Sequence, residues 1–269
     1  MPTRLILGPW THVDAAVRSG PAFAESLAWL DRYAGQDPED PKPGHSARIW
    51  VGGAREWREI TDWPPAGTAP RRWYLGPDGT LSPHEPASGT EVSFRYDPAD
   101  PTPSVGGATM SLTAGVRDNR PVEQRPDVLV FSSEPLDEPV EVFGDVTAEL
   151  RVTRDNPNAD LFVRLCDVDE PGDAHSRSRN VCDGIVRLTD PDPLSGTVSI
   201  SLIGAAHRFG RGHRLRLQVA AGAHPRFARN PGNGQVDASA KDFVVTHYSV
   251  QSPSALVISQ VKGKEATHA

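Results

Sequence analysis

The chain has few lysines and no basic run, which argues against a nucleic-acid partner. Only four of its 28 basic residues are lysine, the formal net charge is −7, and the pI is about 5.7. A surface that neutralises phosphates needs clustered Lys and Arg, and the sequence contains no such stripe. We therefore expect a chain that does not bind nucleic acid.

Long apolar runs are also missing. No stretch of the sequence approaches the ~18–20 consecutive apolar residues that a membrane-spanning helix requires. The first nine residues carry a single charge, and their apolar run is too short for the core of a secretory signal. The predicted location is the cytoplasm, with no membrane partner.

Cysteine is scarce, and its spacing fits neither a zinc site nor a redox motif. Cys166 and Cys182 are 16 residues apart without a CxxC or His spacing, which favours a free, reduced pair. A disulfide stays open if their strands pair. The acidic segments 167–170 and 190–193 offer calcium-type ligands, but turn chemistry explains them with fewer assumptions. We expect no metal and no cofactor.

The first 45 residues have the character of an α/β fold. Residues 3–7 form a short apolar run that ends at Gly8-Pro9, which predicts a buried strand followed by a turn. Pro21 and the apolar spacing that follows predict a helix as far as residue 34, which Gly35 ends. Residues 36–45 are rich in Pro and charge and indicate a linker.

Beyond residue 46 the pattern becomes that of an all-β domain. Short β-branched and aromatic runs alternate with Pro, Gly, Asp and Asn clusters, which is typical of packed antiparallel sheets. Alternation within 197–203, 213–219 and 161–165 predicts one buried and one solvent-facing side for each strand. The predicted strands are 47–51, 71–75, 91–96, 127–132, 140–153, 160–168, 181–188, 197–203, 213–220, 242–249 and 254–261. Two sheets in a jelly-roll-like sandwich would hold them.

His12 is the candidate catalytic residue, because it lies just beyond the strand predicted over 3–7. A histidine in that position can take a proton from a serine and return it to a leaving group, if a carboxylate orients its ring. A single His after a strand is more often an ordinary turn residue. The spacing alone therefore does not decide its role.

Eight ordered segments resemble the cocaine-esterase and Xaa-Pro dipeptidyl-peptidase family of serine hydrolases. Gly8-Pro-Trp-Thr-His12 is similar to the segment that holds the triad histidine of that family. The other matching segments are Trp29–Tyr33, Ile49–Pro64, Trp73–Leu75, Tyr96–Pro101 with Gly106-Gly107, Arg125–Pro135, Cys182–Arg187 and His224–Pro231.

The resemblance implies a C-terminal part of such an enzyme. Residues 1–35 would be the end of an α/β-hydrolase domain, 36–45 a linker, 46–262 a galactose-binding-like β-sandwich, and 263–269 a tail. His12 would be the general base. The partners implied are an N-terminal α/β-hydrolase domain with its cap and, in the intact enzyme, a small ester or peptide substrate. A homo-oligomer stays open.

The sequence departs from the family in lacking the other catalytic groups. No G-x-S-x-G nucleophile motif is present, and the triad Asp belongs upstream of His12, where few residues remain. We therefore predict that the chain alone is inactive. The alternative is a non-catalytic jelly-roll module that binds carbohydrate or a partner protein, since fold alone does not decide function.

Two further features have structural interpretations. All six tryptophans lie within the first 73 residues, and we expect them in the core or between domains rather than at a sugar-binding surface. Trp29 is expected at a domain boundary. Arg226 and Arg229, in the distinctive loop 224–231, are expected to donate hydrogen bonds to carboxylates or carbonyls.

Overall fold

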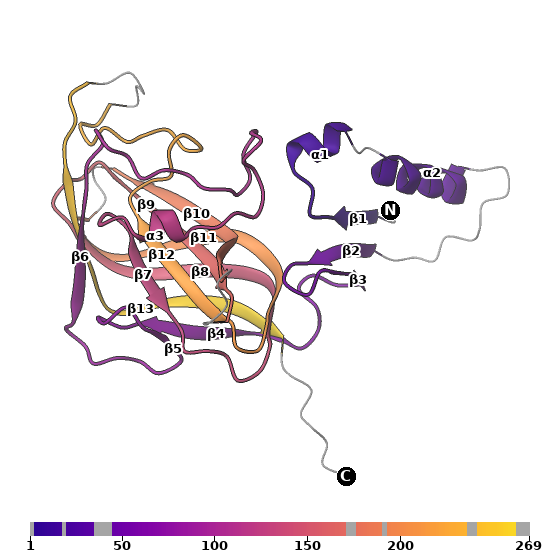
Figure 1. Cartoon of the computed structure of the whole chain (residues 1–269), viewed down its shortest axis with the longest axis horizontal. Coiled ribbons are helices and arrows are strands. Elements are labelled where there is room, and N and C mark those ends of the chain that lie inside the picture. The colour runs from indigo at the N-terminus through magenta and orange to yellow at the C-terminus, as the bar shows by residue number, and fades with distance from the viewer. Residues whose placement is uncertain are drawn as a thin grey trace, which may run out of the picture.

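The computed structural model of the chain describes residues 3–17, 20–34, 45–170, 176–189, 193–235 and 241–261. Figure 1 shows them as a small sheet with two helices beside two larger sheets. The tail predicted over 263–269 lies outside the described residues, as does the predicted linker except for its last residue.

The small sheet is a parallel β-α-β unit with one added strand. β1 (Thr3–Leu7) pairs in parallel with β2 (His45–Val51), and β3 (Glu56–Ile60) pairs antiparallel to β2. α1 (His12–Val17) and α2 (Gly20–Ala34) lie in the connection, which has to return the chain to the same end of the sheet. The predicted strand over 3–7 and the helix ending at residue 34 are confirmed, but the strand is not buried, since Leu5 and Leu7 are exposed. α1 and β3 were not predicted.

The two larger sheets are antiparallel and share one core. The four-stranded sheet has the order β10-β9-β12-β7, and the six-stranded sheet has the order β11-β8-β13-β4-β5, with β6 also paired to β13. The strands are β4 (Thr68–Leu75), β5 (Leu81–Ser82), β6 (Glu91–Tyr96), β7 (Leu129–Ser132), β8 (Val140–Arg154), β9 (Ala159–Val168), β10 (Ser178–Leu188), β11 (Ser195–Phe209), β12 (Arg214–Ala220) and β13 (Thr246–Val261). This is the predicted mainly-β, jelly-roll-like sandwich.

Alternating apolar side chains of both sheets fill the space between them. Leu150 and Leu256 from the six-stranded sheet, and Leu161 and Leu217 from the four-stranded sheet, are fully buried in this core. On β11, Ile200 and Leu202 are buried while Ser199 and Ser201 are exposed, as the alternation predicted.

The prediction of one wet face is wrong for β9, whose ten residues are all buried. Its outer face carries Phe162 and Arg164, and both are covered. Phe162 joins a second apolar cluster with Val122 near α3 (Arg120–Glu123) and with Ala223, while Arg164 donates hydrogen bonds to the loop over it. Alternation within the strand could not reveal this cover, because it comes from segments distant in the sequence.

Two predicted strands prove to be one. The runs 242–249 and 254–261 merge into β13, which continues through Pro253. Its pairing with β8 shifts register between Gln251 and Ala255. A proline has no N–H for the ladder, so a local irregularity is the usual way for a long strand to contain one.

The small sheet is attached to the sandwich at one close backbone approach. The Gly52 N–H donates to the Ala206 carbonyl at 2.9 Å, and the Arg208 N–H donates to the Gly52 carbonyl at 2.8 Å. A Cβ on Gly52 would lie 2.5 Å from Nδ1 of His207, so glycine permits this contact. β2 therefore pairs with β1 and β3, and Gly52 at its end anchors the small sheet to β11.

Candidate active site around His12

His12 lies at the carboxyl end of β1, at the first residue of α1. Gly8-Pro9 turns the chain out of β1, and Thr11 caps the helix that follows. The Thr11 N–H and hydroxyl both donate to Asp14 Oδ2, at 3.1 and 2.8 Å, and the Asp14 N–H donates back to Thr11 Oγ1. This reciprocal pair is a capping box, which fixes the start of α1 and leaves the His12 side chain exposed.

A pocket of about 480 Å³ lies between the His12 loop and the β-sandwich. One wall is the segment Trp10–His12. The other consists of residues 107–110 and 114–116, together with Asn180 and Val181 of β10. The exposed side chains of Met110 and Leu112, at 81% and 84% exposure, belong to the same loop of the sandwich. The predicted general base therefore lies at a junction between the two units.

Within the described residues, the His12 imidazole has no hydrogen-bond or ion-pair partner. Triad chemistry requires both a nucleophile in hydrogen-bond reach of the base and a carboxylate that orients it. The pocket-lining residues include neither an Asp nor a Glu, and none of them is a serine. The site thus contains a proton acceptor but not the rest of a catalytic triad.

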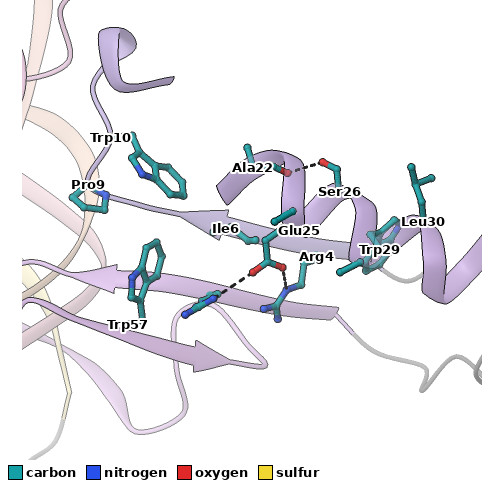
Figure 2. A pocket seen from close by; sticks show the side chains of 13 residues that line it. Arg4, Ile6, Pro9, Trp10, Ala22, Glu25, Ser26, Trp29, Leu30 and Trp57 are labelled. Atoms are coloured by element: carbon teal, nitrogen blue, oxygen red, sulfur yellow. Dashed lines mark hydrogen bonds and ion pairs between the residues drawn. The ribbon is translucent and has the colours of Figure 1, made fainter. Parts of the chain in front are cut away.

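A second and larger cavity lies between β1 and α2. This groove has a volume of about 1150 Å³ and runs between α2 and the small sheet. Figure 2 shows Trp10 and Trp57 at one end of it and Trp29 and Leu30 at the other, with Glu25 pointing down toward the strands. Its walls are mostly apolar.

Two carboxylates hold the arginines of the groove, and one of them is Glu59 of β3, which pairs with Arg4 at 2.8 Å and with Arg48 at 3.7 Å. Glu25 pairs with Arg4 at 3.8 Å and with Arg48 at 3.3 Å, which fastens α2 to β1 and β2. The Arg48 guanidinium also lies 5.0 Å from the centre of a Trp57 ring. These contacts satisfy the charged groups structurally and leave the groove without a candidate catalytic group.

None of the six tryptophans, which all lie in the described part of the chain, is buried, so the expected core role is wrong for them, while a role between domains remains a prediction. The rings of Trp10 and Trp50 lie 5.8 and 5.5 Å from that of Trp57, and Trp29 packs on Tyr33 at 4.3 Å. All four border or approach the small sheet. Whether Trp29 lies at a domain boundary remains a prediction.

The acidic segment 167–170 is used in pairing and not as a metal cage. Asp167 bonds to His207 and His213, at 2.8 and 2.7 Å, and Asp169 pairs with Arg179. In the part of the chain that the structure describes, no group of three or more His, Cys, Asp or Glu side chains has the arrangement of a metal site. The second segment considered, 190–193, lies largely outside the described residues.

The cysteines are free and buried, although their strands are neighbours. Cys182 belongs to the core between the sheets, while Cys166 meets the amide of Gln218 on the outer side of β9. Side chains on opposite faces of a sheet cannot form a disulfide. Burial raises the pKa of the Cys166 thiol to about 12, which makes it an inert structural thiol.

The predicted donors of the 224–231 loop find the expected kinds of acceptor. Arg226 Nη1 donates to both oxygens of Asp183 at 2.7 Å, and Arg229 Nη1 donates to the Pro98 carbonyl at 3.3 Å. Sequence reasoning did not identify the 105–117 loop as part of the His12 pocket. Its only signal was Gly106-Gly107, a pair that marks a backbone of unusual conformation.

The chain thus combines a β-sandwich with a parallel β-α-β unit that has a histidine beyond the carboxyl end of its first strand. Residues 39–257 match the X-Pro dipeptidyl-peptidase C-terminal non-catalytic domain, and the chain belongs to this family. It corresponds to the C-terminal part of enzymes of the cocaine-esterase type.

Relatives with known names are about twice as long as this chain. Cocaine esterase of Rhodococcus sp. (strain MB1 Bresler) is 34% identical over 271 residues, which covers 87% of this chain and 46% of that enzyme. The solved structure of an aminopeptidase from a marine sediment archaeon, Thaumarchaeota archaeon, is 25% identical. It matches with a TM-score of 0.82 over 97% of this chain and 49% of its own.

An α-amino acid ester hydrolase of known structure gives a TM-score of 0.73 at 25% identity, covering 86% of this chain and 43% of its own. The chain thus spans about half the length of the relatives it matches. No helix among the described residues is long and apolar enough to cross a membrane.

Proposed function

We propose that this chain is the C-terminal portion of a serine hydrolase and supplies its general base, His12. The nucleophile, the orienting carboxylate and the oxyanion donors would come from an N-terminal α/β-hydrolase part with its cap. The substrate class proposed is an ester or an Xaa-Pro amide. Without that part, the chain would be inactive.

The observation that carries the proposal is the position of His12. Open α/β sheets bind ligands beyond the carboxyl ends of their parallel strands, and His12 follows β1 at that end. Its side chain is exposed at the pocket between the small sheet and the sandwich. A base in this position is open to a serine brought by another part of the protein.

The incomplete small sheet supports a missing domain. Parallel sheets occur almost only where both faces are covered and where several strands continue the sheet. Here α2 covers the side of β1 that carries Arg4 and Ile6, whereas Leu5 and Leu7 on the opposite side are about half exposed. Among the described residues, no strand pairs with the outer edge of β1.

The outer face of α2 is apolar as well. Phe23, Leu27 and Leu30 follow one stripe of the helix and are 65%, 44% and 55% exposed. Apolar stripes of this kind mark an interaction surface. The bare face of β1 and this stripe are where the α/β-hydrolase part would pack.

The first test asks whether the chain alone lacks the activity. Wild type and His12→Ala should be indistinguishable on a Gly-Pro anilide and should differ little on nitrophenyl acetate, since free imidazole also cleaves activated esters slowly. Saturable turnover by the wild type, together with stoichiometric labelling by a serine-directed fluorophosphonate, would contradict the proposal. A serine of this chain would then be the nucleophile.

The second test restores the missing half. The chain is co-expressed with the N-terminal hydrolase portion of the Rhodococcus cocaine esterase, or with any such portion encoded upstream of its own gene. Activity should appear, and His12→Ala should lower kcat by about 10³-fold or more. His84→Ala is the matched control, because His84 lies in a distant turn of the sandwich and should leave kcat unchanged. Equal losses in both variants would argue against a base role.

A further inference from the structure

The sandwich contributes one wall of the His12 pocket through a closed loop, residues 105–117, which we call the wall loop. Its ends are joined by two backbone hydrogen bonds, Gly107 N–H to the Gly115 carbonyl at 2.7 Å and the reverse at 2.9 Å. Gly106, Gly107 and Gly115 all have positive φ, which glycine adopts without strain. The loop is therefore a defined turn and not a loose excursion.

Asn180 of β10 connects the sheet to the C-terminal end of the wall loop. Its Oδ1 accepts the Arg117 N–H at 2.8 Å, and its Nδ2 donates to the Gly115 carbonyl at 3.2 Å. The side chain is only 7% exposed and also lies at the pocket. Asn119, which is fully buried, donates to the same Oδ1 at 3.3 Å.

A buried ion cluster supports the start of the wall loop. Arg164 and Asp183 are directly opposite each other on β9 and β10 and pair at 3.0 Å, and Arg226 adds a second guanidinium to Asp183 at 2.7 Å. Arg164 Nη1 also donates to the Val105 carbonyl and to Asn119 Oδ1, both at 2.6 Å.

The wall loop lies directly over this cluster. A Cβ on Gly107 would come within 2.7 Å of Arg226 Nη1 and 3.2 Å of Asp183 Oδ2. The close fit exists only because Gly107 has no side chain. The ion cluster thus fixes the distance of the wall loop from β9 and β10, while Asn180 fixes the position of the loop along β10.

The other side of the wall loop touches the histidine segment. A Cβ on Gly115 would lie 3.2 Å from Cγ2 of Thr11, the residue that caps α1 and precedes His12. Thr11 is itself fixed by its hydrogen bonds to Asp14. Asn180 therefore holds Gly115, which lies opposite the side chain of Thr11, the residue before His12.

We infer that Asn180, supported by the Arg164–Asp183–Arg226 cluster, is a positioning residue that holds the wall loop against the His12 segment. The sandwich then fixes one wall of the pocket that His12 borders. The catalytic importance of that pocket rests on the proposed function. The mechanical coupling itself is a property of this chain and can be measured in it.

The experiment uses the full chain with methionine labelled by ¹³C at the methyl group. The sequence contains two methionines, Met1 and Met110, so two methyl signals are expected, and Met110→Leu identifies the second. Met110 and His12 border the same pocket. In the wild-type background, His12→Ala should therefore shift the Met110 methyl resonance.

Asn180→Ala should move the Met110 resonance toward that of a free methionine and abolish its response to His12→Ala. Amide exchange at Gly107 and Gly115 should become about tenfold faster or more. The matched control is Asn156→Ala, which removes a buried asparagine that holds the Gly232 carbonyl in another loop. This control should lower the melting temperature. It should leave unchanged the response of Met110 to His12→Ala and the amide exchange at Gly107 and Gly115.

A second pair of variants tests the inference even if Asn180→Ala does not fold. Gly115→Ala strains a positive-φ position and pushes against Thr11, whereas Gly89→Ala strains a similar backbone with nothing within 4 Å of the new Cβ. Only Gly115→Ala should abolish the response of Met110 to His12→Ala. The inference is overturned if folded Asn180→Ala keeps the wild-type response, or if each variant and its control behave alike. Since no readout needs a nucleophile, a failure of the proposed function would not affect these results.

Discussion

Asp167 joins two histidines from different strands, close to the point where the small sheet meets the sandwich. It lies on β9 and bonds to His207 of β11 and to His213, just before β12. Burial alone would raise the pKa of the Asp167 carboxyl, but the hydrogen bonds from the two rings outweigh it and hold the pKa below 3.8. The bond to Asp167 raises the pKa of His213 above 6.5.

We predict a pH-dependent contribution of His213 to stability. A raised pKa means that the contribution is fully present below pH 6.5 and is lost as the pH rises through the pKa of the folded state. Asp169 favours the charged ring and Arg179 opposes it. His213→Ala should therefore lower the free energy of unfolding by about 1–3 kcal/mol near pH 6 and by less near pH 9.

Urea unfolding of wild type and variant between pH 5.5 and pH 9 measures this difference. His247→Ala is the control, since His247 also pairs with a carboxylate, that of Asp155, but both side chains are more than half exposed. Its cost should be about 1 kcal/mol or less. A cost for His213→Ala that stays constant or grows with pH would contradict the assignment.

At the residue scale, the sequence identified candidate groups in short segments, and the catalytic role of His12 among them remains a prediction. His12 after a strand and the hydrogen-bond donors Arg226 and Arg229 were identified from short segments. Asn180 and Asp183 were not, because their importance depends on loops 60 residues away, at Gly115 and Asn119, folding over β10. No local pattern distinguishes such an asparagine from one in an ordinary strand.

At the element scale, α2 and β1 have much apolar surface and few partners. Figure 1 shows the small sheet at one side of the sandwich, with α2 at its outer limit. The groove beneath α2 and the exposed side chains of Phe23 and Leu30 mean that little apolar area holds the helix in place. Isolated helices of this length are marginally stable without packing.

We therefore predict faster amide exchange in residues 3–34 than in residues 197–220, where β11 and β12 contribute to the buried core. Hydrogen exchange followed by mass spectrometry gives both rates in one experiment. Protection of 3–34 should rise when the N-terminal hydrolase portion is added. Equal protection in the isolated monomer would argue that no partner is missing.

The sequence predicted strands correctly where the alternation of apolar residues and the turn residues agreed. It failed where pairing with neighbouring strands decides whether a segment is a strand. All eleven predicted runs are strands, but β3 and the two-residue β5 exist because neighbouring strands offer them a ladder. β13 was divided at Pro253 because proline usually interrupts pairing. Its neighbours on both sides carry the strand through the irregularity.

At the scale of the whole molecule, the question is which part of the chain folds alone. The sequence placed the start of the folding unit at residue 46, after the linker. In the structure β2 pairs with β1 and β3 joins the same small sheet through β2, whereas the larger core contains buried residues from Leu75 onward. Trp63 packs on Phe143 at 6.4 Å, so the connection after β3 already belongs to the sandwich.

We predict that residues 61–261 fold as a cooperative unit without the first 60 residues. The two sheets keep their entire shared core, because none of its members precedes Leu75. The losses lie at the edge of the sandwich: the Gly52 hydrogen bonds to β11, the approach of Thr11 to the wall loop, and the partly exposed Arg58, which pairs with Glu141 at 2.7 Å and lies over the Phe143 ring. Surface pairs of this kind contribute about 1 kcal/mol or less, so the melting temperature should fall by only a few degrees.

A chain of residues 46–261 separates this prediction from the one based on sequence. Here β2 and β3 lack β1, and their amides should exchange quickly while the sandwich melts as in 61–261. Far-UV circular dichroism should be strand-dominated with one transition in both chains. If 61–261 is unfolded while 46–261 folds with a protected β2–β3 hairpin, the hairpin belongs to the sandwich, and the small sheet is not a separable extension of the missing hydrolase part.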